Sequence, residues 1–97
     1  MGHQVGQQQR LIETPTVRVT RWTLPSGHGT GRHRHEHDYV VVPMTGGTLN
    51  VIDASGESTT MQQVAGEPYA GSAGVEHDVV GADSSNVVFI EVELLMR

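Results

Sequence analysis

Apolar and polar residues alternate in short runs along this chain of 97 residues, and turn-forming residues such as Gly, Pro, Asn and Asp separate the runs. A period of two is typical of β-strands, and no segment shows the 3.6-residue apolar period of an amphipathic helix. Short strands at near-even spacing predict a β-sandwich or a β-barrel. The strands expected from this pattern are residues 11–13, 17–24, 32–42, 48–53, 58–64, 68–70, 75–80 and 87–95.

The strand expected over residues 17–24 is irregular. Its apolar positions change halfway from odd to even numbers, first Val17 and Val19 and then Trp22 and Leu24. Such a change moves the apolar set to the other face of the strand. It predicts either a bulge near residues 20–21 or burial on both faces.

The last strand has two unequal faces. One face is apolar throughout, at Val88, Ile90, Val92 and Leu94. On the other face Val87 and Phe89 give way to Glu91 and Glu93. We interpret this segment as a core strand with one face partly exposed towards its end.

Charge and cysteine content exclude several classes of function. The net charge is −5, and the six basic residues, all Arg, form no basic run that could bind a nucleic-acid backbone or an anionic membrane. The chain has no Cys. Disulfides, thiolate metal sites, Cys nucleophiles and iron–sulfur clusters are therefore excluded.

The length suits a single domain over residues 1–97. The Gly- and Gln-rich composition of residues 1–9 predicts a mobile start. The N-terminal segment has no apolar core of the kind that a signal peptide needs, and no apolar run approaches the roughly 18 residues of a membrane-spanning helix. We therefore expect a soluble, cytoplasmic protein.

The candidate chemistry lies in a row of histidines, His33, His35 and His37. Alternate residues of a strand point to the same side, so these imidazoles would line one face of an extended segment. Neutral imidazoles suit Zn²⁺, Cu²⁺, Fe²⁺ or Ni²⁺. A further histidine, His77, stands in a later predicted strand and can add to the row.

At these residues the sequence resembles the cupin family. That family carries the motifs G-x5-H-x-H-x3-E-x6-G and G-x5-P-x-G-x2-H-x3-N. The first motif is matched in register by Gly27, His33, His35 and Gly46. The second is matched by Gly66, Gly74 and His77.

The resemblance implies an all-β fold, a cupin-type jelly-roll β-barrel in one domain. It implies that His33, His35 and His77 bind a divalent metal ion, which could be Fe²⁺, Zn²⁺, Ni²⁺ or Mn²⁺. Tyr39 stands where the motif has a Glu that is usually a fourth ligand. Three His with open positions still form a workable site, and some cupin dioxygenases use three His without the Glu.

The three departures from the motifs should affect the site to different degrees. Ser72 and Gly81 replace the Pro and the final Asn of the second motif, at turn and edge positions where we expect little effect on the site. The change at Tyr39 matters more. Because the unperturbed pKa of tyrosine is near 10, we favour a role in orienting substrate or in hydrogen bonding to a metal-bound water over direct ligation. His37 remains a weaker candidate ligand. By alternation, the two acidic residues beside it, Glu36 and Asp38, point to the opposite face.

The function that the resemblance implies is that of a metalloenzyme, dioxygenase-like, acting on a small organic molecule inside the barrel, with Tyr39 as a catalytic residue. The alternatives are a non-catalytic cupin that binds a small molecule or a metal, and a metal-dependent isomerase or lyase. Stand-alone cupins usually pair as homodimers, so we expect a homodimer. The segment around the histidines also looks similar to that of short bacterial cupins linked to β-alanine degradation.

Overall fold

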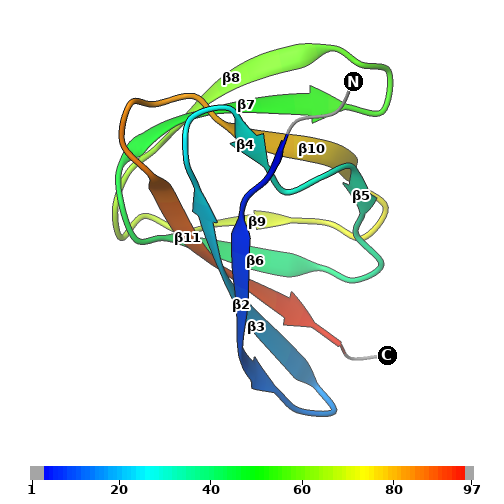
Figure 1. Ribbon diagram of the computed structural model, residues 1–97. Coiled ribbons are helices and arrows are strands. Elements are labelled where there is room, and N and C mark those ends of the chain that lie inside the picture. The colour runs from blue at the N-terminus through cyan, green and yellow to red at the C-terminus, as the bar shows by residue number, and fades with distance from the viewer. Residues whose placement is uncertain (1–3, 96–97) are drawn as a thin grey trace.

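A computed structural model describes residues 4–95 of the chain, and within that range it contains strands, turns and loops but no helix (Figure 1). In chain order the strands are β1 (Gln4–Val5), β2 (Gln7–Glu13), β3 (Val17–Leu24), β4 (His28–Gly29), β5 (His33–Arg34), β6 (Tyr39–Pro43), β7 (Gly47–Asp53), β8 (Ser58–Gln63), β9 (Tyr69–Gly71), β10 (Glu76–Gly81) and β11 (Val87–Leu94).

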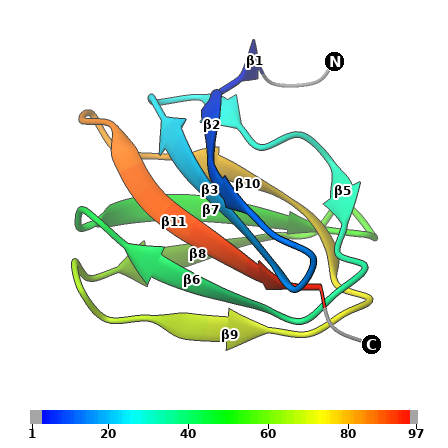
Figure 2. The same ribbon diagram turned by 90° about the horizontal axis from the view of Figure 1, so that it is seen from below.

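The strands form two sheets, which Figures 1 and 2 show from two directions. Sheet A has the order β1-β4-β10-β7-β8, and β5 also pairs with β10. Sheet B has the order β2-β3-β11-β6-β9. In Figure 1 the strands β7, β8 and β10 lie in the upper part of the molecule and β6, β9 and β11 in the lower part. Strands that are distant in sequence are neighbours in both sheets, as a jelly-roll barrel requires, and the prediction of an all-β fold is confirmed.

The space between the sheets changes from apolar to polar along the paired strands β3 and β11. Leu24 pairs with Val87 and Trp22 with Phe89, and all four side chains are buried in the core. Further along the same inner surface, Thr20 pairs with Glu91 and Arg18 with Glu93. The remaining core residues include Tyr39, Val41, Leu49 and Val79. The apolar part stabilises the barrel, whereas the polar part adds little hydrophobic stabilisation.

The segment 32–42, predicted as one strand, is divided between the two sheets. β5 belongs to sheet A and β6 to sheet B, and the chain bends between them. The Asp38 carboxylate supports the bend by accepting a hydrogen bond from the backbone N–H of Ala73 at 2.9 Å. Because the two sheets face each other, one straight strand could not pair in both, and the alternation of His33, His35 and His37 does not continue through the bend.

The irregularity predicted within β3 lies in its neighbour instead. β3 pairs with β11 without a break from Val17 to Leu24. The register shift is in β2, between Arg10 and Ile12, opposite residues 19–20 of β3. Residues 20, 22 and 24 of β3 are buried, and Arg18 and all the odd-numbered residues are half-buried. The alternative of burial on both faces therefore describes β3 better than a bulge.

The predicted mobility of residues 1–9 stays a prediction. Residues 1–3 lie outside the described part. Residues 4–5 and 7–9 belong to strands, and between them the N–H of Gly6 donates to the carbonyl of Gly29 at 2.8 Å. Residues 4–95 contain no helix long and apolar enough to cross a membrane.

Candidate metal centre

Two of the predicted ligands face each other across an antiparallel strand pair. β5 and β10 are in register with His33 opposite His77 and Arg34 opposite Glu76. Directly opposed residues of an antiparallel pair point to the same face of the sheet, with Cα atoms about 4.5–5.5 Å apart. The backbone register therefore brings His33 and His77 together.

The third predicted ligand, His35, follows β5 and is held by the loop before β10. Its N–H donates to the carbonyl of Val75 and its carbonyl accepts from the N–H of Gly74, both at 2.8 Å. Gly74 has a φ of 98°, a left-handed conformation that favours glycine. The side chain of His35 lies in the interior, and the residue is only 3% exposed.

The three histidines converge through their Nε2 atoms. Nε2 of His35 lies 2.9 Å from Nε2 of His33 and 3.1 Å from Nε2 of His77. Among the described residues these three form a group that could hold a metal ion. Two imidazole nitrogens bound to one ion at about 2.0–2.1 Å lie about 3 Å apart when the angle at the ion is about 90°, and about 3.4 Å apart at a tetrahedral angle. The two printed Nε2 separations are in this range, and the three ligand atoms lie within 4.8 Å of one another.

The protonation state of the imidazoles suits metal binding. Burial, with smaller contributions from His33 and His77, lowers the pKa of His35 to about 4. Burial, followed by the effect of His33, lowers the pKa of His77 to about 4 as well. Both rings are therefore neutral near pH 7, the form in which histidine binds a metal.

The orientation of His33 is set by the loop that precedes it. Its Nδ1 lies 2.7 Å from the carbonyl oxygen of Gly31. A carbonyl only accepts hydrogen bonds, so Nδ1 is the protonated nitrogen and Nε2 carries the free lone pair. Gly31 has a φ of 85°, which favours glycine, and it gives the loop the turn that directs this carbonyl towards the ring. Support of this kind is typical of metal-binding histidines.

Tyr39 supports the centre from sheet B. Its ring stacks on the ring of His35, with a centroid separation of 3.8 Å and an interplanar angle of 18°. The end of its side chain lies against Gly71, where a Cβ atom would collide with the ring and the hydroxyl. Burial, followed by the charge of Glu91, raises the pKa of Tyr39, which keeps the phenol protonated. Tyr39 also lines a cavity beside the histidines, and its predicted role stays a prediction.

Glu91 is a residue of the site that the sequence reasoning missed. Its Oε2 lies 3.8 Å from Nε2 of His35, and its side chain is 14% exposed. Burial, and to a smaller degree the charge of Glu93, raise the pKa of Glu91 to about 7. Val87, Phe89 and Glu91 alternate along β11 and point inward. The change from apolar to acidic within this series is the sequence feature that points to Glu91, but it also fits the partly exposed face predicted from the sequence.

Other residues near the motif are not brought into the group. His37 lines a separate surface hollow with Glu36, Asp38, Ala73 and Leu94. The bend after β5 is the reason, because it turns residues 36–38 away from the other histidines. His28 pairs in β4, with its Nδ1 3.2 Å from the carbonyl oxygen of Ser26.

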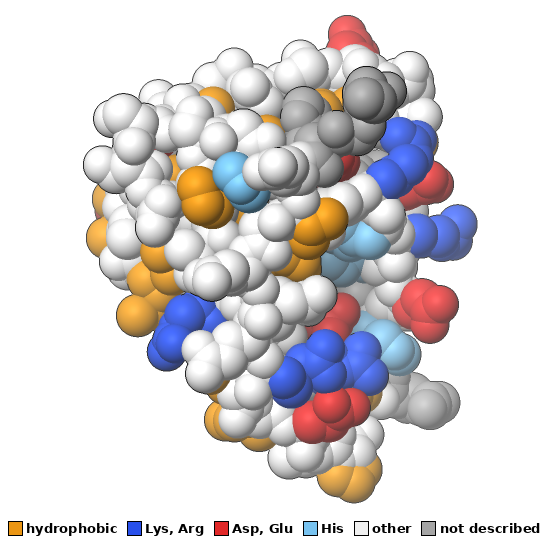
Figure 3. All heavy atoms as spheres, in the orientation of Figure 1, with side chains coloured by type: hydrophobic (Ala, Val, Ile, Leu, Met, Phe, Trp, Pro, Cys, Tyr) orange, Lys and Arg blue, Asp and Glu red, His pale blue; other side chains and the backbone are white. Residues whose placement is uncertain are grey.

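Two spaces adjoin the histidines. An apolar cavity of about 190 Å³ lies between the sheets and is lined mainly by Tyr39, Val51, Met61, Tyr69, Val79 and Phe89. A polar cleft of about 280 Å³ opens on the other side, between β2, β3, β5 and β11. Thr30, His33 and Glu91 line both. Figure 3 shows histidine side chains near the position of β5, with basic and acidic side chains around them.

Comparison with known proteins supports the family. No family model matches the sequence. The chain is 47% identical to the β-alanine degradation protein BauB of Pseudomonas aeruginosa over 83 residues, 86% of either chain. A crystal structure of a cupin domain from Bordetella pertussis is 40% identical, covers 97% of both chains and superposes with a TM-score of 0.89.

A more distant structure shows the fold alone. The polyketide cyclase RemF of Streptomyces resistomycificus is 22% identical, with a TM-score of 0.71 over 99% of this chain and 69% of its own. The two sheets, the motif histidines and the similarity along nearly the full length of the Bordetella domain agree. The chain belongs to the cupin family.

Proposed function

We propose that this protein binds one divalent metal ion through His33, His35 and His77. The observation that carries the proposal is the convergence of three Nε2 atoms, two pairs of which lie 2.9 and 3.1 Å apart. Nitrogen lone pairs at such distances repel one another unless a proton or a cation lies between them. Fe²⁺, Zn²⁺, Ni²⁺ and Mn²⁺ all accept imidazole ligands and remain candidates.

Glu91 fits beside the ion as the carboxylate that the first motif lacks at position 39. The motif supplies its Glu from the strand that begins at Tyr39, whereas Glu91 extends inward from β11, which pairs with that strand. A carboxylate on the opposite sheet is available to the same ion because Oε2 already lies 3.8 Å from Nε2 of His35. Three imidazoles and a carboxylate form a donor set that suits the candidate ions.

We further propose a dioxygenase-type reaction on a small organic molecule. A bound divalent ion supplies Lewis acidity and, in the case of Fe²⁺, chemistry with O₂. The cavity of about 190 Å³ admits only a small substrate, since pockets for drug-sized ligands measure about 300–1,000 Å³. Tyr39 lines this cavity with a protonated phenol and can orient the substrate by donating a hydrogen bond. A degradative role, as in the name of the relative BauB, is compatible with such a substrate.

The first test is metal analysis of the purified protein and of His77→Ala. We expect a stoichiometric divalent metal in the parent and its loss in the variant, and a variant that retains the metal would contradict the three-His site. Oxygen uptake by the Fe²⁺-loaded protein, measured over a panel of small acids and thiols, then tests the reaction. Tight ligand retention without turnover would favour the non-catalytic alternative, and turnover without O₂ would favour an isomerase or lyase.

We also propose that the outer face of sheet B pairs with a second copy of the chain. Part of this face is apolar, and one row in register consists of Ile12, Val19, Val92 and Val40. Ile12 is 52% exposed. An apolar row with polar neighbours such as Arg21 and Gln9 is typical of a protein interface.

Sedimentation velocity tests the pairing. We expect a dimer for the parent and a monomer for Val92→Asp, because the new carboxylate would be buried without a partner in the interface. A monomeric parent at micromolar concentration would refute the pairing without affecting the metal site.

A further inference from the structure

The polar cleft beside the histidines is rich in arginine. Three of the six arginines of the chain, Arg10, Arg18 and Arg34, line it. Two carboxylates, Glu91 and Glu93, line it as well. This concentration of guanidinium groups stands out because the chain as a whole carries a net charge of −5.

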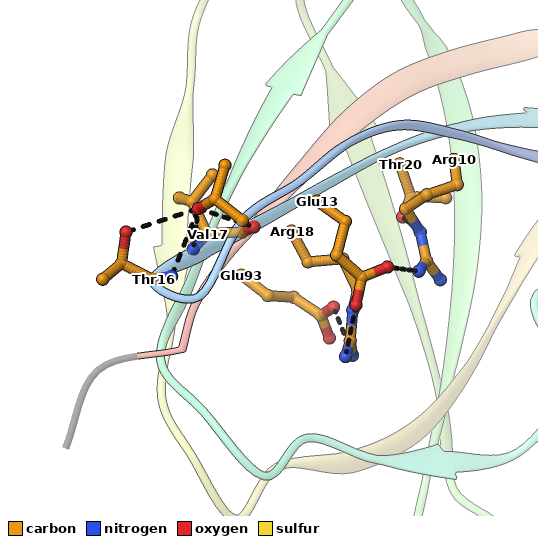
Figure 4. A network of polar contacts seen from close by, with 8 residues as sticks. Arg10, Glu13, Thr16, Val17, Arg18, Thr20 and Glu93 are labelled. Atoms are coloured by element: carbon orange, nitrogen blue, oxygen red, sulfur yellow. Dashed lines mark hydrogen bonds and ion pairs between the residues drawn. The ribbon is translucent and has the colours of Figure 1, made fainter.

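Two of these arginines already converge on one carboxylate, as Figure 4 shows. Nη1 of Arg10 lies 2.8 Å from Oε1 of Glu13, and Nη2 of Arg18 lies 3.4 Å from Oε2 of the same residue. Glu13 is at the end of β2, is 49% exposed and does not line the cleft. The pair of guanidinium groups is thus arranged to hold a carboxylate from the solvent side.

Arg18 is only weakly satisfied by its partners. Both of its ion pairs, to Glu13 and to Glu93, are 3.4 Å long, whereas charge-assisted N–H···O bonds are usually about 2.7–2.9 Å. Its Nε is buried and has no hydrogen-bond partner among the described residues. Arg34 makes no ion pair within residues 4–95. A cleft with under-used guanidinium donors is suited to an added anion.

The cleft also adjoins the apolar cavity at the histidines. Thr30, His33 and Glu91 line both spaces, so a ligand that reached from one space to the other would have one end among arginines and the other among apolar side chains. The apolar end would lie against residues such as Val51 and Phe89. The middle of such a ligand lies beside the three Nε2 atoms.

We propose that the cleft binds the carboxylate of a small organic acid, with Arg18 as the principal carboxylate-binding residue and Arg10 and Arg34 beside it, while the apolar part of the acid extends into the cavity. This inference names the substrate class of the site and rests on the proposed function only for the chemistry at the metal. A planar carboxylate matches the fork of donors on a guanidinium.

The test compares straight-chain acids of three to six carbons with the amides and the alkyl phosphates of the same lengths. Dissociation constants are measured by NMR titration of the full chain, first with a chelator present and then with Zn²⁺ bound. The chelated series removes direct metal–carboxylate bonds as an explanation. It also separates this inference from the proposed function, since a failure to bind metal leaves the chelated series unaffected.

In the parent we expect acids to bind at least about tenfold more tightly than amides, because hydrogen bonds to charged groups discriminate by that factor or more. Arg18→Gln should remove the preference and Arg34→Gln should reduce it. Arg32→Gln is the matched control, because it removes the same charge from an exposed arginine that pairs with Glu76 and lines neither the cleft nor the cavity, and it should keep the preference.

Three results would overturn the inference. Amides that bind the parent as tightly as acids would show that the cleft does not recognise the charge. Alkyl phosphates that bind tenfold more tightly than acids would change the ligand class. An unchanged preference for acids in Arg18→Gln would show that Arg18 does not bind the carboxylate. If Arg18→Gln does not fold, an unchanged preference in Arg34→Gln would overturn the assignment of the carboxylate to the cleft.

Discussion

The two sheets supply the candidate centre by different routes. In sheet A, His33 and His77 meet because β5 and β10 are hydrogen-bonded in register, and His35 is fixed by two further backbone bonds. In sheet B, Tyr39 and Glu91 reach the centre through side-chain packing across the barrel. Backbone pairing fixes positions locally, whereas packing between sheets depends on the whole barrel. The comparison predicts that changes in sheet A abolish metal binding and that changes in sheet B adjust it.

The largest effect should come from His35→Ala. Removing one of three imidazoles leaves two ligands, and we expect metal affinity to fall by more than the about 10- to 100-fold typical of losing an outer-shell partner. Chelator-competition titration measures the change. The matched control is His37→Ala, which alters the neighbouring hollow instead of the centre. Equal losses in the two variants would refute the assignment of His35.

The next effect should come from Glu91→Gln, which keeps the shape of the side chain and removes its charge. We expect the affinity for the metal to fall by about tenfold to a hundredfold. Glu93→Gln is the control on the same inward face, because Glu93 pairs with Arg18 instead of facing His35. If the two variants bind the metal equally well, Glu91 does not contribute to the centre.

Gly71→Ala should have a smaller effect on the metal and a measurable effect on stability. The added methyl group collides with Tyr39 and forces its ring out of the stack on His35. We expect a loss of about 1–3 kcal/mol in the free energy of unfolding, as for other overpacked cores. Urea denaturation measures it. Gly46→Ala, where the new Cβ would make only ordinary contacts, should be close to the parent, and a similar result for Gly71→Ala would contradict the close packing.

Tyr39→Phe should have the smallest effect on metal affinity. Phenylalanine keeps the stacked ring and removes only the hydroxyl group, so metal binding and stability should remain close to those of the parent. Oxygen uptake by the Fe²⁺-loaded protein should fall if the hydroxyl orients the substrate. Unchanged uptake would restrict Tyr39 to a supporting role.

The features that follow from local pattern could be predicted from the sequence. Outside residues 28–42, the strands from Val17 onward agree closely with the prediction from the alternation, since the period of two is a property of each strand alone. The group of His33, His35 and His77 agrees with motif spacing, since the motif glycines define the turns that place β5 and β10. These features depend on residues close together in the chain or on a recognised spacing.

The features that follow from the pairing of distant strands could not be predicted. The bend after His35 exists because β5 and β6 belong to different sheets. The residues between these strands include no Pro, which would have indicated a bend in the sequence. The inward face of β11 was also ambiguous, because both faces carry apolar residues and only pairing with β3 and β6 decides which one the barrel encloses. Glu91 was missed for that reason.

The alternation along β11 has a consequence for regulation. Its inner face carries Glu91, and its outer face carries Ile90 and Val92, the immediate neighbours on the same backbone. If a second copy packs on the outer face, association and metal binding act on one strand and become thermodynamically linked. If metal binding then changes the association constant by some factor, association changes the metal affinity by the same factor. Metal occupancy would therefore depend on protein concentration as well as on the supply of the ion.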